Sequence, residues 1–508
     1  MSKRFYITTA IAYPNGRPHM GHAYEAIATD AIARFKRLDG FDVRFLTGTD
    51  EHGLKIAQAA RAAGVEPRDY VNGTVQPFID LDNQLGISFD RFIRTTDADH
   101  KAVCQLLWDR MAANGDLYLG RYEGWYSVRD EAYYDDAELL TAEDAKGLPV
   151  KLSPQGTPVE WTVEESWFFK LSAYAQPLLA LYENNPEFVQ PTRRLNEMRS
   201  FVAGGLSDLS VSRTSFDWGV PVPGSPGHVM YVWVDALTNY LTGAGGIDGE
   251  WWPADLHVIG KDVVRFHAVY WPAFLMSAGI ALPKQVYGHG FLLNRGEKMS
   301  KSLGNVVDPG EMAARFGVDR LRWFLLREVA FGEDGSYSDE AIIERTNADL
   351  ANGIGNLAQR ALSMVAKNLG GALPVPGPHQ GADELAASIK ALTDAYFAAM
   401  NALQLHRALE AVMGMVAAAN GFFAEAAPWR LAKTDIAAMA NVLGVTLDAT
   451  RRIVLLIQPF TPAASAALLD LLGVAADARD FDGFDTAVPP GTQLPVPQGV
   501  FPRWTEAA

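Results

Sequence analysis

The chain has 508 residues, of which 48% are hydrophobic and 20% are charged, and this balance is typical of a globular protein with several domains. Its formal net charge of −16 excludes a general nucleic-acid coat, so any contact with RNA has to be local. Cys104 is the single cysteine, which excludes an internal disulfide and a cysteine-built zinc knuckle, and the scattered histidines predict no metal site. No apolar run is long enough to cross a membrane and the first residues lack a signal core, so we expect a cytoplasmic protein without membrane contact.

The first predicted unit is a strand, a turn and a helix. The β-branched and aromatic run at residues 4–9 predicts a buried strand, and residues 13–16 predict a turn. Apolar residues at helical spacing predict a helix over residues 23–38. His19 and His22 therefore lie at the start of a helix, where unpaired N–H groups and a partial positive charge favour a phosphate. On these residues alone, two capping or surface histidines are an equally good interpretation.

Strands and helices alternate over residues 1–115, which predicts a parallel, doubly wound sheet. The second strand is expected at residues 42–47 and is soon followed by Asp50. Ligands of such sheets bind at the carboxyl ends of the strands, where an acidic side chain can hold an ammonium group or a ribose hydroxyl. The alternative role of Asp50 is the N-cap of a helix over residues 51–63.

The alternating pattern breaks after residue 115. Aromatic and polar residues alternate between residues 118 and 134, as is typical of antiparallel strands, so we interpret residues 116–222 as an inserted domain. The strand and helix pattern resumes over residues 223–292. There we expect a strand at residues 229–236 and a helix at residues 263–277.

The region of residues 293–338 contains a short cationic loop, Lys298-Met299-Ser300-Lys301-Ser302. By itself such a pentamer is usually a solvated turn. Residues 339–488 are rich in Ala and Leu at a spacing of 3.6 residues, which predicts a helix bundle. The proline-rich residues 489–508 predict an extended tail.

Together, His19-Met20-Gly21-His22 and the loop Lys298 to Ser302 resemble the two signature motifs of class I aminoacyl-tRNA synthetases, His-Ile-Gly-His and Lys-Met-Ser-Lys-Ser. Met20 replaces the usual Ile with a residue of similar volume. Residues 164–171 and 196–213 resemble the connective insert of the methionyl-tRNA synthetase family. The resemblance covers nearly the whole chain. It implies an α/β protein with a doubly wound, Rossmann-like catalytic domain, an inserted connective domain and an α-helical anticodon-binding bundle.

The resemblance also implies the activity. Members of this family join L-methionine to ATP as methionyl adenylate and then transfer the methionyl group to the 3′-terminal ribose of tRNA(Met), releasing pyrophosphate and AMP. Such a site has to align the reactants and neutralise phosphate charge. ATP is expected with Mg²⁺, bound mostly by the triphosphate. Ser127-Val128-Arg129-Asp130 stands where many members have a Cys-x-x-Cys zinc knuckle, so we expect no structural zinc and an insert held by aromatic packing.

The resemblance assigns a role to each matching position of this chain. The catalytic contacts to the ATP phosphates would come from His19, His22, Lys298 and Lys301. The ATP site would comprise Gly16, Gly21, Glu25, Gly260, Asp262, Lys298, Met299, Ser300, Lys301 and Ser302. The methionine site would comprise Ile11, Ala12, Tyr13, Asp50, Trp233, Ala236, Leu237, Tyr240, Phe266 and His267. The reader of the CAU anticodon would comprise Asn352, Asn356, Arg360 and Trp429.

Within the methionine site, Asp50 would hold the ammonium group, while Tyr240 and His267 would face the sulfur. The family often has Leu at Ile11 and Pro at Leu237, which implies a slightly different pocket shape. Core packing is the competing interpretation for the aromatic residues. A solvated helix face is the competing interpretation for the Asn and Arg residues of the bundle.

Three other functions stay open from the sequence. A class I synthetase for cysteine would be expected to hold its substrate with zinc, and one for leucine would be expected to carry a larger editing insert. A synthetase-like RNA-binding protein could have lost catalysis, and a nucleotidyltransferase could share the ancestral fold. Because the chain stops after the bundle and lacks the further module that some relatives use to dimerise, we expect a monomer.

Overall fold

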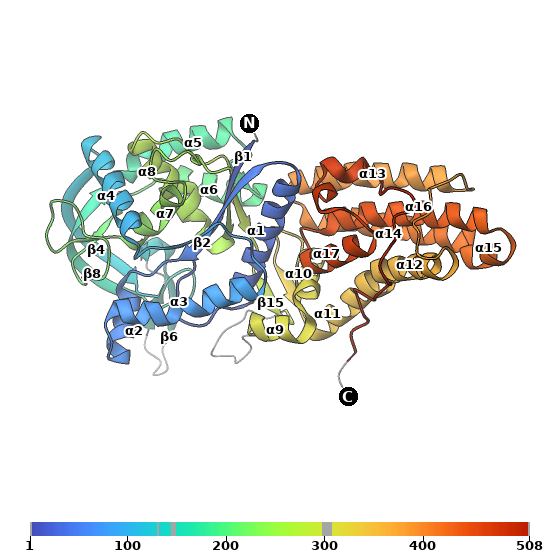
Figure 1. The fold of residues 1–508 in the computed structure, drawn as a ribbon. Coiled ribbons are helices and arrows are strands. Elements are labelled where there is room, and N and C mark those ends of the chain that lie inside the picture. Colours follow the sequence, from blue (N-terminus) through green and yellow to red (C-terminus); the bar gives the residue numbers. More distant parts are fainter. Residues whose placement is uncertain (1–2, 130–131, 144–148, 297–306, 506–508) are drawn as a thin grey trace.

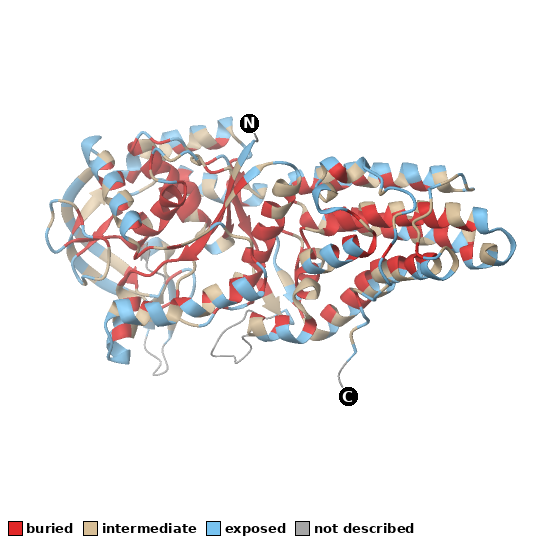
Figure 2. Ribbon diagram, viewed as in Figure 1, coloured by how far each residue is buried: buried red, intermediate tan, exposed pale blue. Residues whose placement is uncertain are grey.

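The computed structural model describes residues 3–129, 132–143, 149–296 and 307–505. An α/β part and a helical bundle lie side by side, with helix α1 and helices α9 to α11 between them (Figure 1). Buried residues run through the centre of both parts (Figure 2). The loop Lys298 to Ser302 lies outside the described residues.

A six-stranded parallel sheet forms the centre of the α/β part, in the order β3-β2-β1-β13-β14-β9. Its strands are β1 (Arg4–Thr9), β2 (Asp42–Thr49), β3 (Arg91–Arg94), β9 (Val189–Gln190), β13 (Leu256–Gly260) and β14 (Val286–His289). The central strand β1 pairs with β2 on one side and with β13 on the other, so the strand order reverses there. This order confirms the doubly wound sheet and places its ligand crevice at the carboxyl end of β1.

The helices of the α/β part pack around this sheet (Figure 1). They are α1 (Met20–Leu38), α2 (Leu54–Ala63), α3 (Pro67–Gln84), α4 (Ala98–Ala113), α7 (Val232–Gly243) and α8 (Trp271–Ser277). The expected strand at residues 229–236 is wrong: β12 (Val229–Met230) is short, and α7 already begins at Val232. Nearly every residue of α7 is buried, and a helix that is apolar all round cannot be told from a buried strand by periodicity.

The expected helix at residues 263–277 is divided into three segments. A 3₁₀ turn, η3 (Lys261–Val263), is followed by a π-helical segment, η4 (Phe266–Tyr270), and then by α8. A π segment is often found at functional sites because it rotates its side chains out of the regular α-helical pattern. Phe266 and His267 lie in this segment.

The inserted region contains an antiparallel sheet in the order β10-β8-β4-β5. Its elements are β4 (Leu117–Ser127), β5 (Ala132–Tyr134), η1 (Asp136–Glu138), β6 (Leu140–Glu143), β7 (Pro149–Leu152), β8 (Glu160–Phe169), η2 (Leu171–Tyr174), α5 (Ala175–Asn184), α6 (Thr192–Ala203), β10 (Leu209–Ser210) and β11 (Ser212–Arg213). The same region supplies β9, the edge strand of the central sheet.

Buried hydroxyl groups join Ser127, at the end of β4, to the segment between β7 and β8. The Thr157 hydroxyl oxygen lies 2.7 Å from that of Ser127 and 2.8 Å from that of Ser153. Trp125 and Trp161 also pack edge to face across β4 and β8, with ring centroids 5.3 Å apart. Hydrogen-bonded hydroxyls therefore supplement the aromatic packing that the sequence led us to expect.

The second part is a helical bundle. It comprises α10 (Val318–Glu328), α11 (Asp339–Thr346), the π-helical η6 (Asn347–Gly355), α12 (Asn356–Asn368), α13 (Ala382–Asn401), α14 (Leu405–Ala426), α15 (Pro428–Thr434), α16 (Ile436–Ile457), α17 (Pro462–Leu471), η7 (Ala476–Ala478) and η8 (Asp482–Asp485). Between the two parts lie β15 (Leu292–Asn294), α9 (Pro309–Phe316) and β16 (Gly335–Tyr337). The proline-rich tail has no regular structure through Thr505, yet it packs on the bundle through buried Leu494 and Phe501.

One buried arginine joins the bundle to helix α1. The fully buried guanidinium of Arg322, on α10, lies 2.6 Å from the Asp30 carboxylate, on α1. It also donates hydrogen bonds to the carbonyl oxygens of Pro459 and Phe460, just after α16. The helix that starts at His19 is therefore held directly against the bundle.

Replacing Arg322 by Ala should destabilise the chain strongly, because it leaves the Asp30 carboxylate buried beside fewer cationic partners. We expect the free energy of unfolding in urea to fall by about 3–5 kcal/mol. The control is Arg4→Ala, whose ion pair with Glu250 is half exposed and should contribute little. Equal midpoints for the two variants would contradict this account of the contact.

Candidate active site

The segment after β1 and the loop after β2 meet at the carboxyl edge of the sheet. The Ala12 amide donates to the Gly48 carbonyl oxygen at 2.9 Å, and the Asp50 amide donates to the Ala12 carbonyl oxygen at 2.8 Å. These bonds place Ile11, Ala12 and Tyr13 beside Asp50. Helix α2 begins only at Leu54, with Gly53 as its N-cap, so Asp50 does not cap it.

His19 and His22 form a reciprocal cap on the start of α1. The His19 Nδ1 atom accepts from the Gly21 amide and the His22 Nδ1 atom accepts from the His19 amide, both at 3.1 Å. The two rings stack with centroids 3.8 Å apart. Because each Nδ1 atom accepts a hydrogen bond, each neutral ring carries its proton on Nε2. The helix start therefore presents two Nε2–H donors as well as its backbone amides.

The local surroundings keep the ring of His22 uncharged. Burial, and to a smaller extent the charge of His19, hold the pKa of His22 well below its ordinary value, so this ring is neutral near pH 7. A Cβ atom on Gly21 would lie 2.9 Å from His19 Cε1 and would displace that ring. Gly16 lies half-buried in the preceding turn.

Glu25, one turn further along α1, connects the segment after β1 with the end of β14. Its carboxylate accepts from the Ala10 amide at 3.0 Å and lies 2.8 Å from His289 Nε2, at the end of β14. Burial alone would lower the pKa of His289, but the hydrogen bond and charge of Glu25 outweigh it and raise that pKa. Sequence reasoning missed His289. A histidine in the short apolar run before the cationic loop was the available signal.

The end of β13 approaches this pair closely. A Cβ atom on Gly260 would lie 2.7 Å from Asp262 Oδ1, so no larger residue fits there without movement. Asp262 is exposed, and its charge contributes to the raised pKa values of both Glu25 and His289. Glu25, Gly260 and Asp262 thus come together from α1 and β13, next to the histidine pair that caps α1.

A buried cluster of apolar side chains adjoins the same sheet edge. Trp233 of α7 stacks on Phe266 of η4, with ring centroids 3.7 Å apart and an interplanar angle of 7°. Ala236, Leu237 and Tyr240 are buried on α7, and Ile11 packs on the same cluster. The structure therefore brings together the apolar residues that the sequence assigned to one pocket.

Tyr240 and His267 form a neutral polar pair in this cluster. His267 Nδ1 lies 2.9 Å from the Val263 carbonyl oxygen and therefore donates to it, so Nε2 accepts from the Tyr240 hydroxyl at 2.7 Å. Burial lowers the pKa of His267 to about 4 and raises that of Tyr240 well above its ordinary value. Tyr240 and His267 consequently offer hydrogen-bonding groups within the cluster while both side chains stay uncharged.

A separate cluster lies on the bundle, far along the chain. The Arg360 guanidinium lies 5.3 Å from the ring centroid of Trp429 and 4.8 Å from that of Phe423. Trp429 is 41% exposed at the start of α15, so a face of its ring is open to solvent. Asn352 and Asn356 are exposed, but Asn352 lies in the π-helical η6. Asn356 and Arg360 lie one turn apart on α12, which follows η6 directly.

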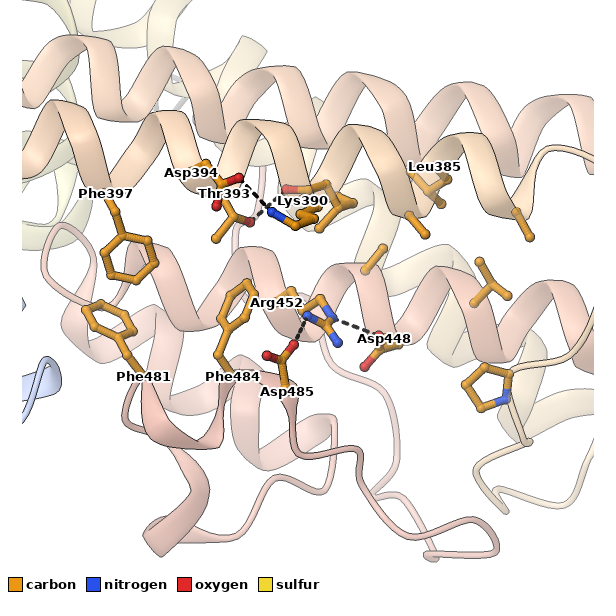
Figure 3. A pocket seen from close by; sticks show the side chains of 16 residues that line it. Leu385, Lys390, Thr393, Asp394, Phe397, Asp448, Arg452, Phe481, Phe484 and Asp485 are labelled. Carbon is orange, nitrogen blue, oxygen red and sulfur yellow. Dashed lines mark hydrogen bonds and ion pairs between the residues drawn. The ribbon is translucent and has the colours of Figure 1, made fainter.

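The bundle also contains a cavity of about 630 Å³ between α13, α16 and η8 (Figure 3). Its charged side chains pair with one another: Lys390 with Asp394, and Arg452 with both Asp448 and Asp485. None of the residues assigned to a site lines it. This cavity is therefore separate from the site at the sheet edge.

His267 should remain neutral far below the pH at which histidine ordinarily titrates. Its pKa of about 4, against 6.5 for the unfolded chain, means that its contribution to stability is complete above pH 6.5 and is lost as the pH falls toward 4. Histidine-selective ¹⁵N NMR, assigned with His267→Gln, measures this titration. A midpoint near 6.5 would contradict the hydrogen-bond assignment.

Among the described helices, none combines the length and apolar character that a membrane crossing requires.

Comparisons with known proteins cover both parts of the chain. A family model described as tRNA synthetases class I (M) matches residues 5–362, and one described as the anticodon binding domain of methionyl tRNA ligase matches residues 374–508. The methionine–tRNA ligase of Mesorhizobium japonicum is 58% identical, over 99% of this chain and 98% of that protein. That of Brucella suis is 57% identical, over 99% of each.

Solved structures give the same result. The chain is similar to Mycobacterium tuberculosis methionyl-tRNA synthetase in complex with methionyl-adenylate, with a TM-score of 0.95, 57% identity and coverage of 99% of this chain and 100% of that one. The free form of the same enzyme gives a TM-score of 0.90 and 53% identity, over 100% of this chain and 99% of that one. The chain therefore belongs to the methionyl-tRNA synthetases, a family of class I aminoacyl-tRNA synthetases.

Proposed function

We propose that the sheet edge forms one ligase site, in which the side around the start of α1 binds ATP and the side around α7 and η4 binds methionine. The enzyme joins L-methionine to tRNA(Met) in two steps, formation of methionyl adenylate from methionine and ATP and then transfer to the 3′-terminal ribose. The observation that carries the site assignment is that a histidine-capped helix start and a buried apolar cluster with a polar pair lie at one sheet edge. The similarity to a relative that was solved with methionyl-adenylate supports it.

The start of α1 binds the ATP phosphates. During adenylate formation the methionine carboxylate attacks the α-phosphorus and pyrophosphate leaves, so negative charge shifts over the phosphate oxygens. The Nε2–H groups of His19 and His22 and the helix N-terminus donate to these oxygens. Lys298 and Lys301, which lie outside the described residues, would neutralise the leaving pyrophosphate. Mg²⁺ would be held by phosphate oxygens and water and would supply further positive charge.

The nucleoside part of ATP lies between α1 and β13. Glu25 is held by the Ala10 amide and His289, which fixes its carboxylate for hydrogen bonds with ribose or adenine. Gly16, Gly21 and Gly260 allow the nucleotide to approach the backbone. Asp262 is the exposed acceptor at the end of β13. Met299, Ser300 and Ser302 belong to the same proposed ATP site but lie outside the described residues.

Methionine binds against the apolar cluster, with its ammonium group on Asp50 and its side chain beside Trp233, Leu237 and Phe266. The neutral pair of Tyr240 and His267 faces the thioether sulfur, which is polarisable and accepts only weak hydrogen bonds. Tyr13, together with Ile11 and Ala12, covers the substrate. Apolar contacts alone separate methionine from leucine by about 1–3 kcal/mol, so this polar pair adds the further selectivity.

The bundle binds the anticodon of tRNA(Met). Trp429 offers an open ring face on which a splayed base stacks, and Arg360 lies beside it. Asn352 and Asn356 add hydrogen bonds on the neighbouring surface.

The buried hydroxyls of Ser127, Ser153 and Thr157 are poor ligands for zinc, so we propose that the insert folds and functions without zinc. We further propose a cytoplasmic monomer, because translation consumes the product there; light scattering tests the mass.

Exchange of pyrophosphate into ATP, run with each amino acid in turn, tests the function. We expect the strongest exchange with methionine, followed by charging of tRNA(Met). Strongest exchange with leucine or cysteine would refute the assignment. Binding of tRNA without adenylate formation would instead indicate a protein that lost catalysis, and adenylate formation without tRNA charging would indicate a nucleotidyltransferase.

Replacing His22 by Gln separates capping from catalysis. Glutamine at this helix position can still accept from the His19 amide, as in a capping box, but it lacks the Nε2–H donor. We expect kcat for pyrophosphate exchange to fall by about 10²–10³, the effect of losing one donor to a developing oxyanion, with the KM for methionine unchanged. The control is His379→Gln in the bundle, and equal kcat values for the two variants would contradict the role of His22.

Replacing Trp429 by Ala should weaken tRNA recognition alone. Loss of one base stack costs about 1–3 kcal/mol, so the KM for tRNA(Met) should rise by roughly 5- to 150-fold. Trp429→Phe keeps an aromatic face and should restore most of the affinity. Pyrophosphate exchange without tRNA should be the same for both variants. A KM for tRNA that is unchanged in Trp429→Ala would show that the anticodon binds elsewhere.

A further inference from the structure

Asp235 joins two histidines in the centre of the α/β part. Its carboxylate lies 2.6 Å from His52 Nδ1 through Oδ2, and 2.7 Å from His100 Nε2 through Oδ1. All three side chains are at most 2% exposed. Asp235 comes from α7, His100 from α4 and His52 from the loop that follows β2. One carboxylate thus joins a loop and two helices that are distant in the sequence.

This cluster stands next to the proposed methionine site without lining the pocket itself. Asp235 lies on α7 between Trp233 and Ala236, which belong to the apolar wall. His52 lies two residues after Asp50, the proposed holder of the ammonium group, and its carbonyl oxygen accepts from the Tyr13 hydroxyl at 3.1 Å. The His52–Asp235 bond is therefore a direct cross-link between the two ends of the proposed substrate site.

A metal centre is the competing interpretation, because His100, Cys104 and Asp235 offer three donor atoms within 4.8 Å of one another. Two ligands on a tetrahedral metal with bonds of 2.0–2.1 Å lie about 3.3 Å apart. The 2.7 Å between His100 Nε2 and Asp235 Oδ1 is instead a hydrogen-bond distance. Burial, with the charge of Asp235, also raises the pKa of Cys104 well above its ordinary value, which disfavours the thiolate that a metal needs.

The electrostatics of the cluster keep Asp235 ionised. Burial alone would raise the pKa of Asp235, but the charges and hydrogen bonds of His52 and His100 outweigh it and hold that pKa far below its ordinary value. A charged acceptor bonded to two ring donors makes shorter and stronger hydrogen bonds than a neutral one. The link between the loop and α7 is consequently stiff.

We propose that His52 and Asp235 are positioning residues that set the distance between the ammonium holder Asp50 and the apolar wall on α7. By fixing this distance, the pair acts as a spacer that determines which length of amino acid fits the site. The distance matters because an error of about 1 Å in substrate placement can cost about 10²-fold in rate. This inference rests on the proposed roles of Asp50 and of the apolar pocket.

His52→Gln and Asp235→Asn test the proposal by pyrophosphate exchange. Each variant removes the charged link between the loop and α7 and leaves the start of α1 intact. We expect the KM for methionine to rise at least tenfold, with the KM for ATP within twofold of the wild-type value. Because KM is a property of the folded fraction, a lower yield of active enzyme does not imitate this split. If Asp235→Asn fails to fold, His52→Gln still decides the question.

The matched control is His100→Gln, which alters the other hydrogen bond to the same carboxylate but no bond to the Asp50 loop. We expect it to lower the melting temperature and to leave the KM for methionine within threefold of wild type. If the KM for methionine rises as much in His100→Gln as in His52→Gln, the cluster is merely structural and the proposal is overturned. An unchanged KM in His52→Gln would also overturn it, and so would a stoichiometric metal in the purified chain that Asp235→Asn removes.

Asp50→Asn, measured in parallel, separates this proposal from the site assignment beneath it. If Asp50→Asn raises the KM for methionine while His52→Gln does not, the positioning role alone fails. If Asp50→Asn also leaves that KM unchanged, the assignment of the ammonium site fails first. A rise in both variants, with His100→Gln near wild type, supports the spacer.

Discussion

The parallel pairing of β1 with both β2 and β13 is the constraint on which the site depends. Parallel strands send all their carboxyl ends to one edge, so the segments that follow them converge there whatever their separation in sequence. That edge collects residues 11–13, Asp50 and Gly260, and it sets α1, α7 and η4 around them. The apolar cluster and the histidine-capped helix start therefore lie together as a consequence of one sheet topology.

The start of α1 shows how one pair of side chains satisfies two requirements. The rings of His19 and His22 accept hydrogen bonds from backbone amides that would otherwise lack partners at a helix start. That use of Nδ1 decides where the remaining proton sits, and it directs Nε2–H donors to the place where the helix already favours an anion. The capping interpretation and the phosphate-binding interpretation of these histidines are therefore compatible.

Much of this architecture could be predicted from the sequence, because buried strands, amphipathic helices and the two signature motifs leave strong local patterns. The strand expected at residues 229–236 failed, since an apolar run gives no periodicity with which to tell a buried helix from a strand. The π-helical turns at η4 and η6 depend on tertiary packing and leave no local signal. Partners such as His289, Asp235 and Arg322 act over distances of more than a hundred residues, which a single sequence does not pair.

The account claims that one sheet edge holds methionine and the ATP phosphates together, and a crystal structure of this chain with methionine and a non-hydrolysable ATP analogue tests that claim most directly. The account predicts the methionine sulfur next to Tyr240 and His267, and phosphate oxygens within hydrogen-bond distance of the Nε2 atoms of His19 and His22. Methionine bound away from Trp233 and His267, or phosphates bound away from the start of α1, would contradict it.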